Sequence, residues 1–319
     1  MRRRRENGEG RLDDAARAGW LYYVAGNTQD EIAAKLGISR QSAQRLVSLA
    51  VSERLVKVRL DHPLANCLDL AKRLREDFGL PYCEVVPSDP ASDSTTLGIA
   101  DAAAAEIERQ LKSPDMKVMA IGTGRTLKAA CEQLPRIDAA DKKIVSLTGN
   151  FAPDGSAAFY GVIFTMADVV NARLYPMPLP VVAASPEERD LLHRQIIVRT
   201  TLQLAAQADV TFVGIGELGP KAPLLQDGFI TKDELSALTE AGAVMEIVGW
   251  AFDGQGRLVQ GLTNARVASA PLPSIEQSRV IAVAMGAAKL PGIRVALEYR
   301  LVNGLITDER TAEKLVGAA

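Results

Sequence analysis

The stretch Thr28–Leu49, TQDEIAAKLGISRQSAQRLVSL, predicts two short helices joined by a tight turn. Thr28 and Glu31 have the spacing of a capping box, in which a hydroxyl and a carboxylate satisfy the free amides of a helix start. Gly37 can take the left-handed conformation that ends a helix, and Ser39 can cap the next one. This pattern is typical of a helix-turn-helix; an ordinary helical hairpin with a solvated face is the alternative.

The second of these helices has an apolar back and a polar front. Its apolar positions recur at helical spacing, at Ala43, Leu46, Val47 and Ala50. Arginine, glutamine and serine side chains on the other face can read base edges and phosphates in a major groove. We therefore predict DNA contacts from this face and from both caps, that is from Thr28, Ser39, Arg40, Gln41, Gln44 and Arg45.

Charge is distributed unevenly along the chain. The formal net charge is −2, yet residues 1–60 carry a balance of +5 and the remainder a balance of −7. Such a basic head on an acidic body indicates a polyanion partner at the head only. Residues 1–10, with four consecutive arginines from Arg2 to Arg5, predict a disordered arm that either touches DNA phosphates or is merely solvated.

The segments around the helix pair complete a head. Residues 12–25 predict a preceding helix with an apolar stripe made of Ala16, Trp20, Tyr23 and Val24. Leu55–Leu60 alternates apolar and basic residues, which predicts a strand like the wing of a winged helix, with Lys57 and Arg59 available to the phosphate backbone. We therefore expect a DNA-binding domain over 11–62, followed by a linker helix over 63–80.

From Tyr82 onward, short apolar runs rich in β-formers alternate with helical stretches. Helices are predicted at Thr95–Leu111, Arg125–Gln133 and Ala157–Ala172. The predicted strands are Cys83–Val86, Lys117–Ile121, Lys142–Leu147, Asp209–Gly214, Ala243–Val248 and Arg279–Val283. This alternation predicts an α/β body over 81–319 with a mostly parallel sheet covered on both faces, whose ligands bind at the C-terminal ends of its strands.

Three polar, glycine-bearing loops follow predicted strands. Glycines let a backbone approach an anion, and a helix start supplies amides and the positive end of a dipole. The first loop, IGTGRTL, lacks the pattern of a Walker loop or of a dinucleotide fingerprint, so a structural turn is an equal alternative. The candidate ligand residues of the three loops are Gly122, Thr123, Gly124, Arg125, Thr126, Gly149, Asn150, Gly214 and Gly216.

Three charged residues are further candidates. Glu246 lies inside an apolar run, where an unpaired charge is costly, so it either accepts sugar hydroxyls or pairs with a basic neighbour. Lys289 follows a predicted strand and either pairs with a phosphate or is solvated. Asp253 either caps a turn or belongs to a ligand loop.

Composition narrows the class of protein. A length of 319 residues predicts about two domains. The longest uncharged runs have 13 residues, too few to cross a bilayer, and no apolar run follows the basic N-terminus, so we expect neither a membrane span nor a secretory signal. Cys67, Cys83 and Cys131 are too far apart for a metal site and fit a reducing cytosol.

The order of several segments resembles the SorC/DeoR-type sugar-responsive transcriptional regulators. These segments are QDEIAAKLGISRQSAQRL, IGTGRTL, VGIG, GAVMEIVGWAFD, AVAMGAAK and NGLITDERTAEKLV. The resemblance spans essentially the whole chain. It implies a winged-helix head and a body similar to sugar-phosphate isomerases. It further implies phosphate contacts at Gly124–Thr126, at Gly149 with Asn150 and at Lys289, and a sugar contact at Glu246.

We therefore expect a cytoplasmic, homodimeric or homotetrameric regulator, a repressor or an activator, of a carbohydrate or polyol operon. Its partners would be operator DNA and a sugar, polyol or sugar-phosphate effector, with no cofactor, metal or catalytic residue. The alternative is a sugar-phosphate isomerase or deaminase with an appended head. Its acid or base would be a carboxylate, since His193 lies in a predicted amphipathic helix. A structural nucleoid protein would not need the acidic body.

Overall fold

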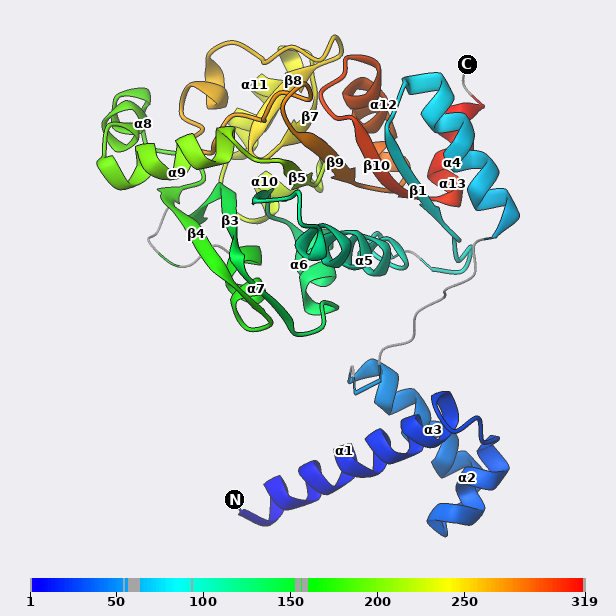
Figure 1. Cartoon of the computed structure of the whole chain (residues 1–319). Helices are drawn as coiled ribbons and strands as arrows, with labels where there is room; N and C mark the ends of the chain where they lie inside the picture. Colours follow the sequence, from blue (N-terminus) through cyan, green and yellow to red (C-terminus); the bar gives the residue numbers. More distant parts are fainter. Residues whose placement is uncertain are drawn as a thin grey trace. The chain divides into compact units, whose positions relative to one another are not determined.

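The computed structural model describes residues 2–53, 55–56, 64–92, 94–152, 156 and 160–317, with only the backbone of residues 2–9. The chain divides into two compact units, Met1–His62 and Pro63–Ala319, called the head and the body below. Figure 1 shows the helices of the head in blue, and the body in the colours from cyan to red.

The head contains α1 (Arg2–Tyr23), α2 (Gln29–Leu36) and α3 (Arg40–Ser52). The capping box of Thr28 and Glu31 is formed, and Gly37 ends α2 in the left-handed conformation with φ of 65°. The hydroxyl oxygen of Ser39 accepts the amide of Ser42 at the start of α3. The predicted helix pair is thus confirmed, and the start of each helix is capped by the side chains that indicated it.

The first helix differs from the prediction in two ways. It begins at Arg2, so the segment expected to be a disordered arm is helical from there on, in keeping with the helix propensity of arginine and glutamate. Its packing face is made of small residues such as Ala15 and Ala18, while Trp20 is 55% exposed. A Cβ on Gly19 would come within 2.7 Å of the Ala50 Cβ, so α1 approaches α3 too closely for large side chains.

The predicted wing falls mostly outside the described residues. Leu55 and Val56 form a bend after α3, and Lys57 and Arg59 are not among the residues that the structure describes. The wing stays a prediction.

The body is built on a seven-stranded sheet in the order β1-β10-β9-β5-β2-β3-β4, in which every pair of neighbours is parallel. The strands in chain order are β1 (Tyr82–Val86), β2 (Val118–Ile121), β3 (Ile137–Phe151), β4 (Val170–Pro180), β5 (Val210–Val213), β9 (Arg279–Val283) and β10 (Gly304–Asp308). The mostly parallel α/β body is confirmed.

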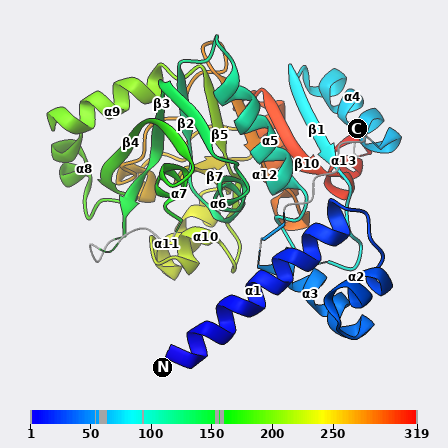
Figure 2. The ribbon, with the colours of Figure 1, turned by 60° about the horizontal axis from the view of Figure 1, so that its bottom comes forward.

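Helices cover both faces of this sheet, and each face has its own apolar core (Figures 1 and 2). One face packs against α5 (Ile99–Lys112), α6 (Arg125–Glu132) and α7 (Val162–Ala167). The other packs against α4 (Ala65–Phe78), α9 (Ile196–Ala206), α12 (Leu290–Glu298) and α13 (Glu309–Val316). Helix α4 was expected to be a linker, but it buries Cys67, Leu70 and Leu74 in the core of the body.

A smaller substructure, the cap, extends over residues 216–265. It holds an antiparallel sheet of β6 (Gly216–Glu217), β7 (Ala243–Ile247) and β8 (Trp250–Asp253), the helices α10 (Pro223–Gln226) and α11 (Lys232–Glu240), and the turn η1 (Leu262–Ala265). Leu224, Leu235 and Leu238 belong to its separate apolar cluster. The strand predicted at Ala243–Val248 therefore does not join the parallel sheet, because a tight turn folds it back onto β8.

Strand β4 was missed and lies where the end of a helix was expected. It contains Pro176, Pro178 and Pro180, which cannot donate backbone hydrogen bonds. Because β4 is the last strand of the sheet, only one of its sides needs donors. Prolines at alternate positions remove amides from a single side of the strand, which makes this sequence compatible with an edge position.

Candidate functional site

A cavity lies where the loops after β2, β5 and β9 meet the cap. Strands β2 and β5 are neighbours in the sheet. The strand that follows β2, β3, lies on one side of this pair, and β9, the next strand of the sheet after β5, lies on the other. Such a reversal of strand order is the switch point at which sheets of this kind bind ligands. The residues lining the cavity are Thr95, Thr123–Leu127, Thr148, Tyr160, Val181, Gly214, Ile215, Gly216, Pro223, Leu224, Asp227, Phe229, Glu246, Val248, Gly249 and Lys289.

One part of the cavity suits an anion. Gly124, with φ of 121°, precedes α6 and has no side chain to cap it, unlike the threonine and serine before α2 and α3. No side chain caps the first turn of α6, so its backbone amides and the positive end of its dipole can interact with an anion in the cavity. Arg125 follows directly, and Lys289 reaches the same cavity from the turn after β9.

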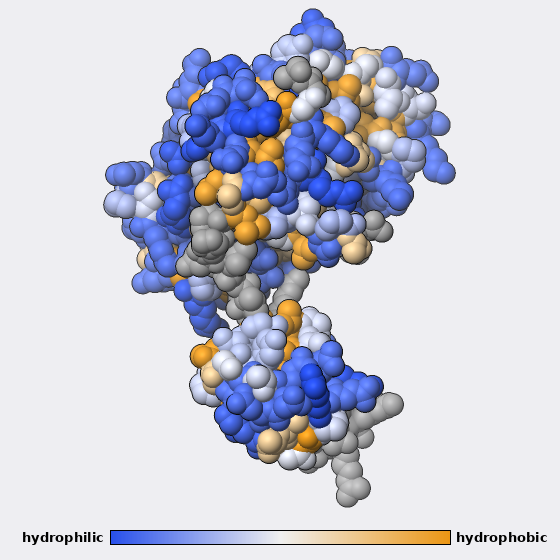
Figure 3. Space-filling view, turned by 90° about the vertical axis from the view of Figure 1, so that its right-hand side faces the viewer, coloured by the Kyte–Doolittle hydropathy of each residue, from blue (hydrophilic) through white to orange (hydrophobic). Residues whose placement is uncertain are grey.

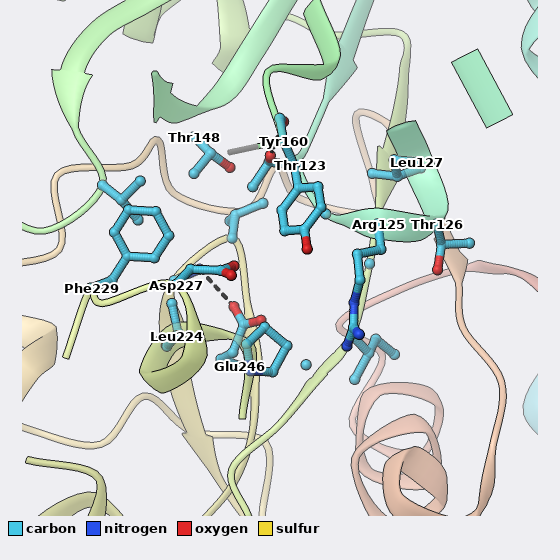
Figure 4. Close-up of a pocket in the computed structure, with 18 of the residues that line it drawn as sticks. Thr123, Arg125, Thr126, Leu127, Thr148, Tyr160, Leu224, Asp227, Phe229 and Glu246 are labelled. Carbon is cyan, nitrogen blue, oxygen red and sulfur yellow. Dashed lines mark hydrogen bonds between the residues drawn. The ribbon is translucent and has the colours of Figure 1, made fainter. Parts of the chain in front are cut away.

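The opposite part carries carboxylates. Glu246 lies on β7 and accepts the amide of Gly249 at 2.8 Å. Burial raises the pKa of Glu246, and the charge of Asp227 raises it further, against the lowering effects of the Gly249 amide and Lys289. Figure 4 shows Asp227 and Glu246 directed toward the same region, with Arg125 entering from another side.

The turn that holds Glu246 is strained. Val248 and Gly249 both have positive φ, 49° and 90°, as a two-residue hairpin turn of this hand requires. A β-branched residue rarely adopts this conformation. The turn directs the Gly249 amide toward the Glu246 carboxylate. The strained conformation of this turn therefore holds Glu246 in its position at the cavity.

Lys289 is also perturbed. Burial lowers the pKa of Lys289, and Arg125 lowers it further, while Glu246 and Glu217 oppose this. Within the described residues neither Glu246 nor Lys289 forms an ion pair within 4.0 Å. The alternative explanation for Glu246, a salt bridge to a basic neighbour, therefore does not apply. Both side chains remain available to a ligand.

Sequence reasoning missed several residues that line the cavity, and two of them, Thr148 and Asp227, offer polar groups to a ligand. The Thr148 hydroxyl is buried and has no hydrogen-bond partner among the described residues, which marks a place for a ligand group. Its signal was a polar residue inside an apolar run, the same signal that identified Glu246. Asp227 precedes Gly228 and reads as an ordinary turn, so only the fold of the cap reveals it; burial raises the pKa of Asp227 as well.

The structure brings together most of the predicted loop residues. The predicted ligand residues that line the cavity are Thr123, Gly124, Arg125, Thr126, Gly214, Gly216, Glu246 and Lys289. Gly122, Gly149, Asn150 and Asp253 do not line it. Gly122 instead donates its amide to the Phe212 carbonyl at 2.8 Å, which joins the ends of β2 and β5.

The other three serve the backbone. A Cβ on Gly149 would lie 2.4 Å from the Leu179 carbonyl oxygen, so this glycine permits a close approach of β3 and β4. Asn150 donates its side-chain amide to the Met177 carbonyl at 3.0 Å. Asp253 accepts hydrogen bonds from the backbone amides of Gln255 and Arg257, each at 2.9 Å. It therefore caps a turn, and it does not belong to a loop that lines the ligand cavity.

The predicted DNA-reading face of the head is exposed. Arg40, Gln41, Gln44 and Arg45 project from α3, and its opposite face buries Ala43, Val47 and Ala50. Arg40 lies 3.5 Å from Asp30 in an exposed ion pair. The hydroxyl groups of Thr28 and Ser39 accept hydrogen bonds from backbone amides in the first turns of α2 and α3. A nucleic acid would therefore contact these two residues at the starts of the helices.

His193 does not approach the cavity. Its Nε2 lies 3.0 Å from the Ala268 carbonyl oxygen at the end of α8 (Pro186–His193). No cluster of three or more potential metal ligands occurs among the described residues. In the same part of the chain, no helix is both long and apolar enough to cross a membrane.

Comparisons with known proteins agree with this arrangement. Residues 62–317 match the family model described as "Putative sugar-binding domain". The chain is 35% identical over 303 residues to the erythritol catabolism regulatory protein EryD of Brucella abortus, covering 95% of this chain and 96% of that protein. It is 29% identical to the transcriptional regulator LsrR of Klebsiella pneumoniae, over 95% of this chain and 93% of that one.

Solved structures share the fold over 78 to 96% of this chain. The full-length sorbitol operon regulator SorC from Klebsiella pneumoniae covers 96% of this chain and 99% of its own, with a TM-score of 0.70 and 24% identity. A DeoR family transcriptional regulator from Listeria monocytogenes covers 78% of this chain and 99% of its own, with a TM-score of 0.69 and 21% identity.

Proposed function

This chain belongs to the SorC/DeoR-type transcriptional regulators with a sugar-binding domain, and on that premise we propose that a small polyhydroxylated effector in the body cavity controls the binding of α3 to operator DNA. The protein is a sugar-responsive regulator, and its relatives are named regulators rather than enzymes. The Brucella relative is named for erythritol catabolism, so we propose a short polyol or its phosphate ester as the effector class.

The observation that carries this proposal is the division of the cavity into a cationic and an acidic part. Amides of the α6 start, Arg125 and Lys289 suit a phosphate or another anionic end. Glu246, Asp227 and the unpartnered Thr148 hydroxyl suit several neighbouring hydroxyls. A polyol phosphate would satisfy both parts at once.

Control of DNA binding follows from the position of this cavity. It is formed by loops of the main sheet together with residues of the cap, so a bound effector would favour an arrangement in which both approach it. An effector shifts an equilibrium only by binding one arrangement more tightly. We propose that paired copies of the chain, as dimers or tetramers in the cytoplasm, transmit this preference to the spacing of their recognition helices on two half-sites.

A ligand screen tests the proposal. Erythritol, other polyols, sugars and their phosphate esters are added to the purified chain, and thermal unfolding is followed, since a ligand of the folded state raises the unfolding temperature. We expect a polyol or polyol phosphate to raise it and to change the affinity for operator DNA. A ligand that binds without changing DNA affinity, or turnover of the added compound, would contradict the proposal.

A further inference from the structure

A second cavity of the body lies apart from the cavity described above, which is called the effector cavity from here on. Its walls come from the loops after β1 and β9 and from the start of α13. Its volume is about 280 Å³, near the lower end of the roughly 300–1,000 Å³ that small-molecule sites occupy. Figure 3 faces the side of the body with α4 and α13, where hydrophilic residues predominate and hydrophobic ones form smaller groups. The size and the setting suit a small polar ligand.

The second cavity has its own set of residues. Of the described residues, only Thr95 lines both cavities. The turn η2 (Ala287–Lys289) contributes to each, since Ala287 lines the second cavity and Lys289 lines the effector cavity. The Gly286 amide donates to the Thr311 hydroxyl at 2.9 Å, which holds the start of this turn on α13. A ligand of the second cavity would therefore not use the groups that suit the effector.

Two cations on α13 line the second cavity. Arg310 and Lys314 lie one turn apart on this helix, and like charges at that spacing destabilise a helix. Arg310 also lies in the first turn, where the helix dipole disfavours a cation. Among the described residues neither side chain forms an ion pair within 4.0 Å. An oxyanion between them would relieve the repulsion and accept charged hydrogen bonds from both.

The two carboxylates that line the second cavity have other partners. Asp308 is buried as the N-cap of α13, where its oxygens accept the Thr311 amide at 3.1 Å and the Ser88 hydroxyl at 2.6 Å. Asp89 is exposed, and one of its oxygens accepts the Ala91 amide at 2.9 Å. Both carboxylates would repel a long polyanion such as a nucleic acid, which limits the occupant to a small anion.

The acids of α13 itself do not line the second cavity. Glu309 accepts the side-chain amide of Asn66 on α4 at 2.5 Å, and Glu313 is exposed. A further donor comes from the loop after β1. The Ser92 hydroxyl lines the cavity and accepts the Ser94 amide at 3.1 Å, so its own proton remains available to a ligand.

We propose that the second cavity binds a phosphate ion between Arg310 and Lys314, with the Ser92 hydroxyl as a further donor. The site goes beyond the proposed function, because it shares none of the charged groups assigned to the effector. It can therefore be occupied whether or not an effector is bound.

Phosphorus-31 NMR titration of the full chain with inorganic phosphate, at constant ionic strength, tests the proposal. The background variant Arg125→Gln/Lys289→Ala removes both side-chain cations of the effector cavity, so that binding there does not obscure the result. We expect this background to bind phosphate, and the added changes Arg310→Gln/Lys314→Gln to weaken binding roughly tenfold or more.

The control adds Arg73→Gln/Lys232→Gln to the same background. Both residues are exposed and line neither cavity, so the same net charge is removed and binding should be retained. A background that binds no phosphate, or equal losses in the two combined variants, would overturn the proposal. The failure of the proposed effector would leave this outcome unchanged, because the background already lacks Arg125 and Lys289.

A pair of neutral substitutions separates a cavity site from simple attraction of counterions. Ala287→Phe fills the second cavity without changing charge, whereas Ala288→Phe places the same ring at an exposed neighbour that lines neither cavity. In the same background, we expect Ala287→Phe to weaken phosphate binding and Ala288→Phe to leave it unchanged. Equal dissociation constants for the two, with both unfolding temperatures retained in phosphate-free buffer, would reduce Arg310 and Lys314 to unspecific surface charge.

Discussion

The carboxylate of Glu246 lies directly over the α-carbon of Gly216. The two residues are paired across β6 and β7, and a Cβ on Gly216 would come within 1.9 Å of Oε1 of Glu246. The absence of a side chain at position 216 therefore allows the acid to reach the cavity. The loop predicted to approach a ligand with bare backbone instead makes room for a side chain that lines the ligand cavity.

Gly216→Ala should displace Glu246 and weaken effector binding. The loss of a charged hydrogen-bond acceptor costs roughly 1.5–3 kcal/mol, which is about 10- to 150-fold in affinity. Calorimetric titration with the effector identified by the screen measures it. Gly254→Ala is the control, because a Cβ there meets nothing within 4 Å. Equal affinities of both variants would show that Glu246 does not need its present position.

Glu246→Gln should alter the pH dependence of stability. Burial raises the folded-state pKa of Glu246 above that of the unfolded chain, so the folded protein binds this proton more tightly. The group therefore loses stabilisation as the pH rises from the ordinary carboxyl pKa through the raised one. We expect the variant to be more stable than the wild type at neutral pH, and the difference to shrink in acid. Parallel unfolding curves at all pH values would contradict this.

Asp227→Asn should weaken binding of the polyol part of the effector. Its carboxylate makes no ion pair within the described residues and lines the acidic part of the cavity. We expect a roughly tenfold or larger loss of affinity, with the unfolding temperature of the free protein retained. Glu240→Gln, an exposed change on α11 of the same cap, provides the comparison and should bind as the wild type does.

Lys289→Ala should discriminate between a polyol and its phosphate ester. The ammonium group can pair with a phosphate but has less to offer a neutral hydroxyl. The variant should lose most of its affinity for the ester and little for the free polyol, while still binding operator DNA. Lys221→Ala removes an exposed charge from the cap as a control. If the wild type binds both compounds equally, the anionic end of the proposed effector is wrong.

Arg45→Ala should weaken operator binding by roughly 1–3 kcal/mol and leave effector binding unchanged, because Arg45 lies on the exposed front of α3. Fluorescence anisotropy with operator DNA measures the change. Arg73→Ala on α4 removes the same charge from the surface of the body. Similar small effects in both variants would reduce the role of Arg45 to net charge.

Local signals in the sequence were reliable where short-range chemistry decides the structure. Thr28, Gly37 and Ser39 predicted helix ends, because capping depends on residues within one turn. Arg125 and Lys289 were found for a similar reason, since they follow predicted strands whose parallel arrangement places their ends at one edge.

Other features depend on contacts far along the chain. Gly149 resembles a ligand loop in sequence, yet the approach of β4 explains it. Asp227 enters the cavity only because the cap folds over the sheet ends. Trp20 was assigned to an apolar stripe, but the close approach of α1 and α3 admits only small residues there. Spacing alone carries no information on these distances.

The prolines of β4 also affect how copies of this chain can meet. An open sheet edge with free amides recruits strands from other molecules, which leads to aggregation or strand exchange. With Pro176, Pro178 and Pro180 at alternate positions, that edge offers few donors to an incoming strand. An incoming strand from another copy therefore finds few hydrogen-bond donors at this edge of the sheet, which disfavours strand exchange and aggregation there.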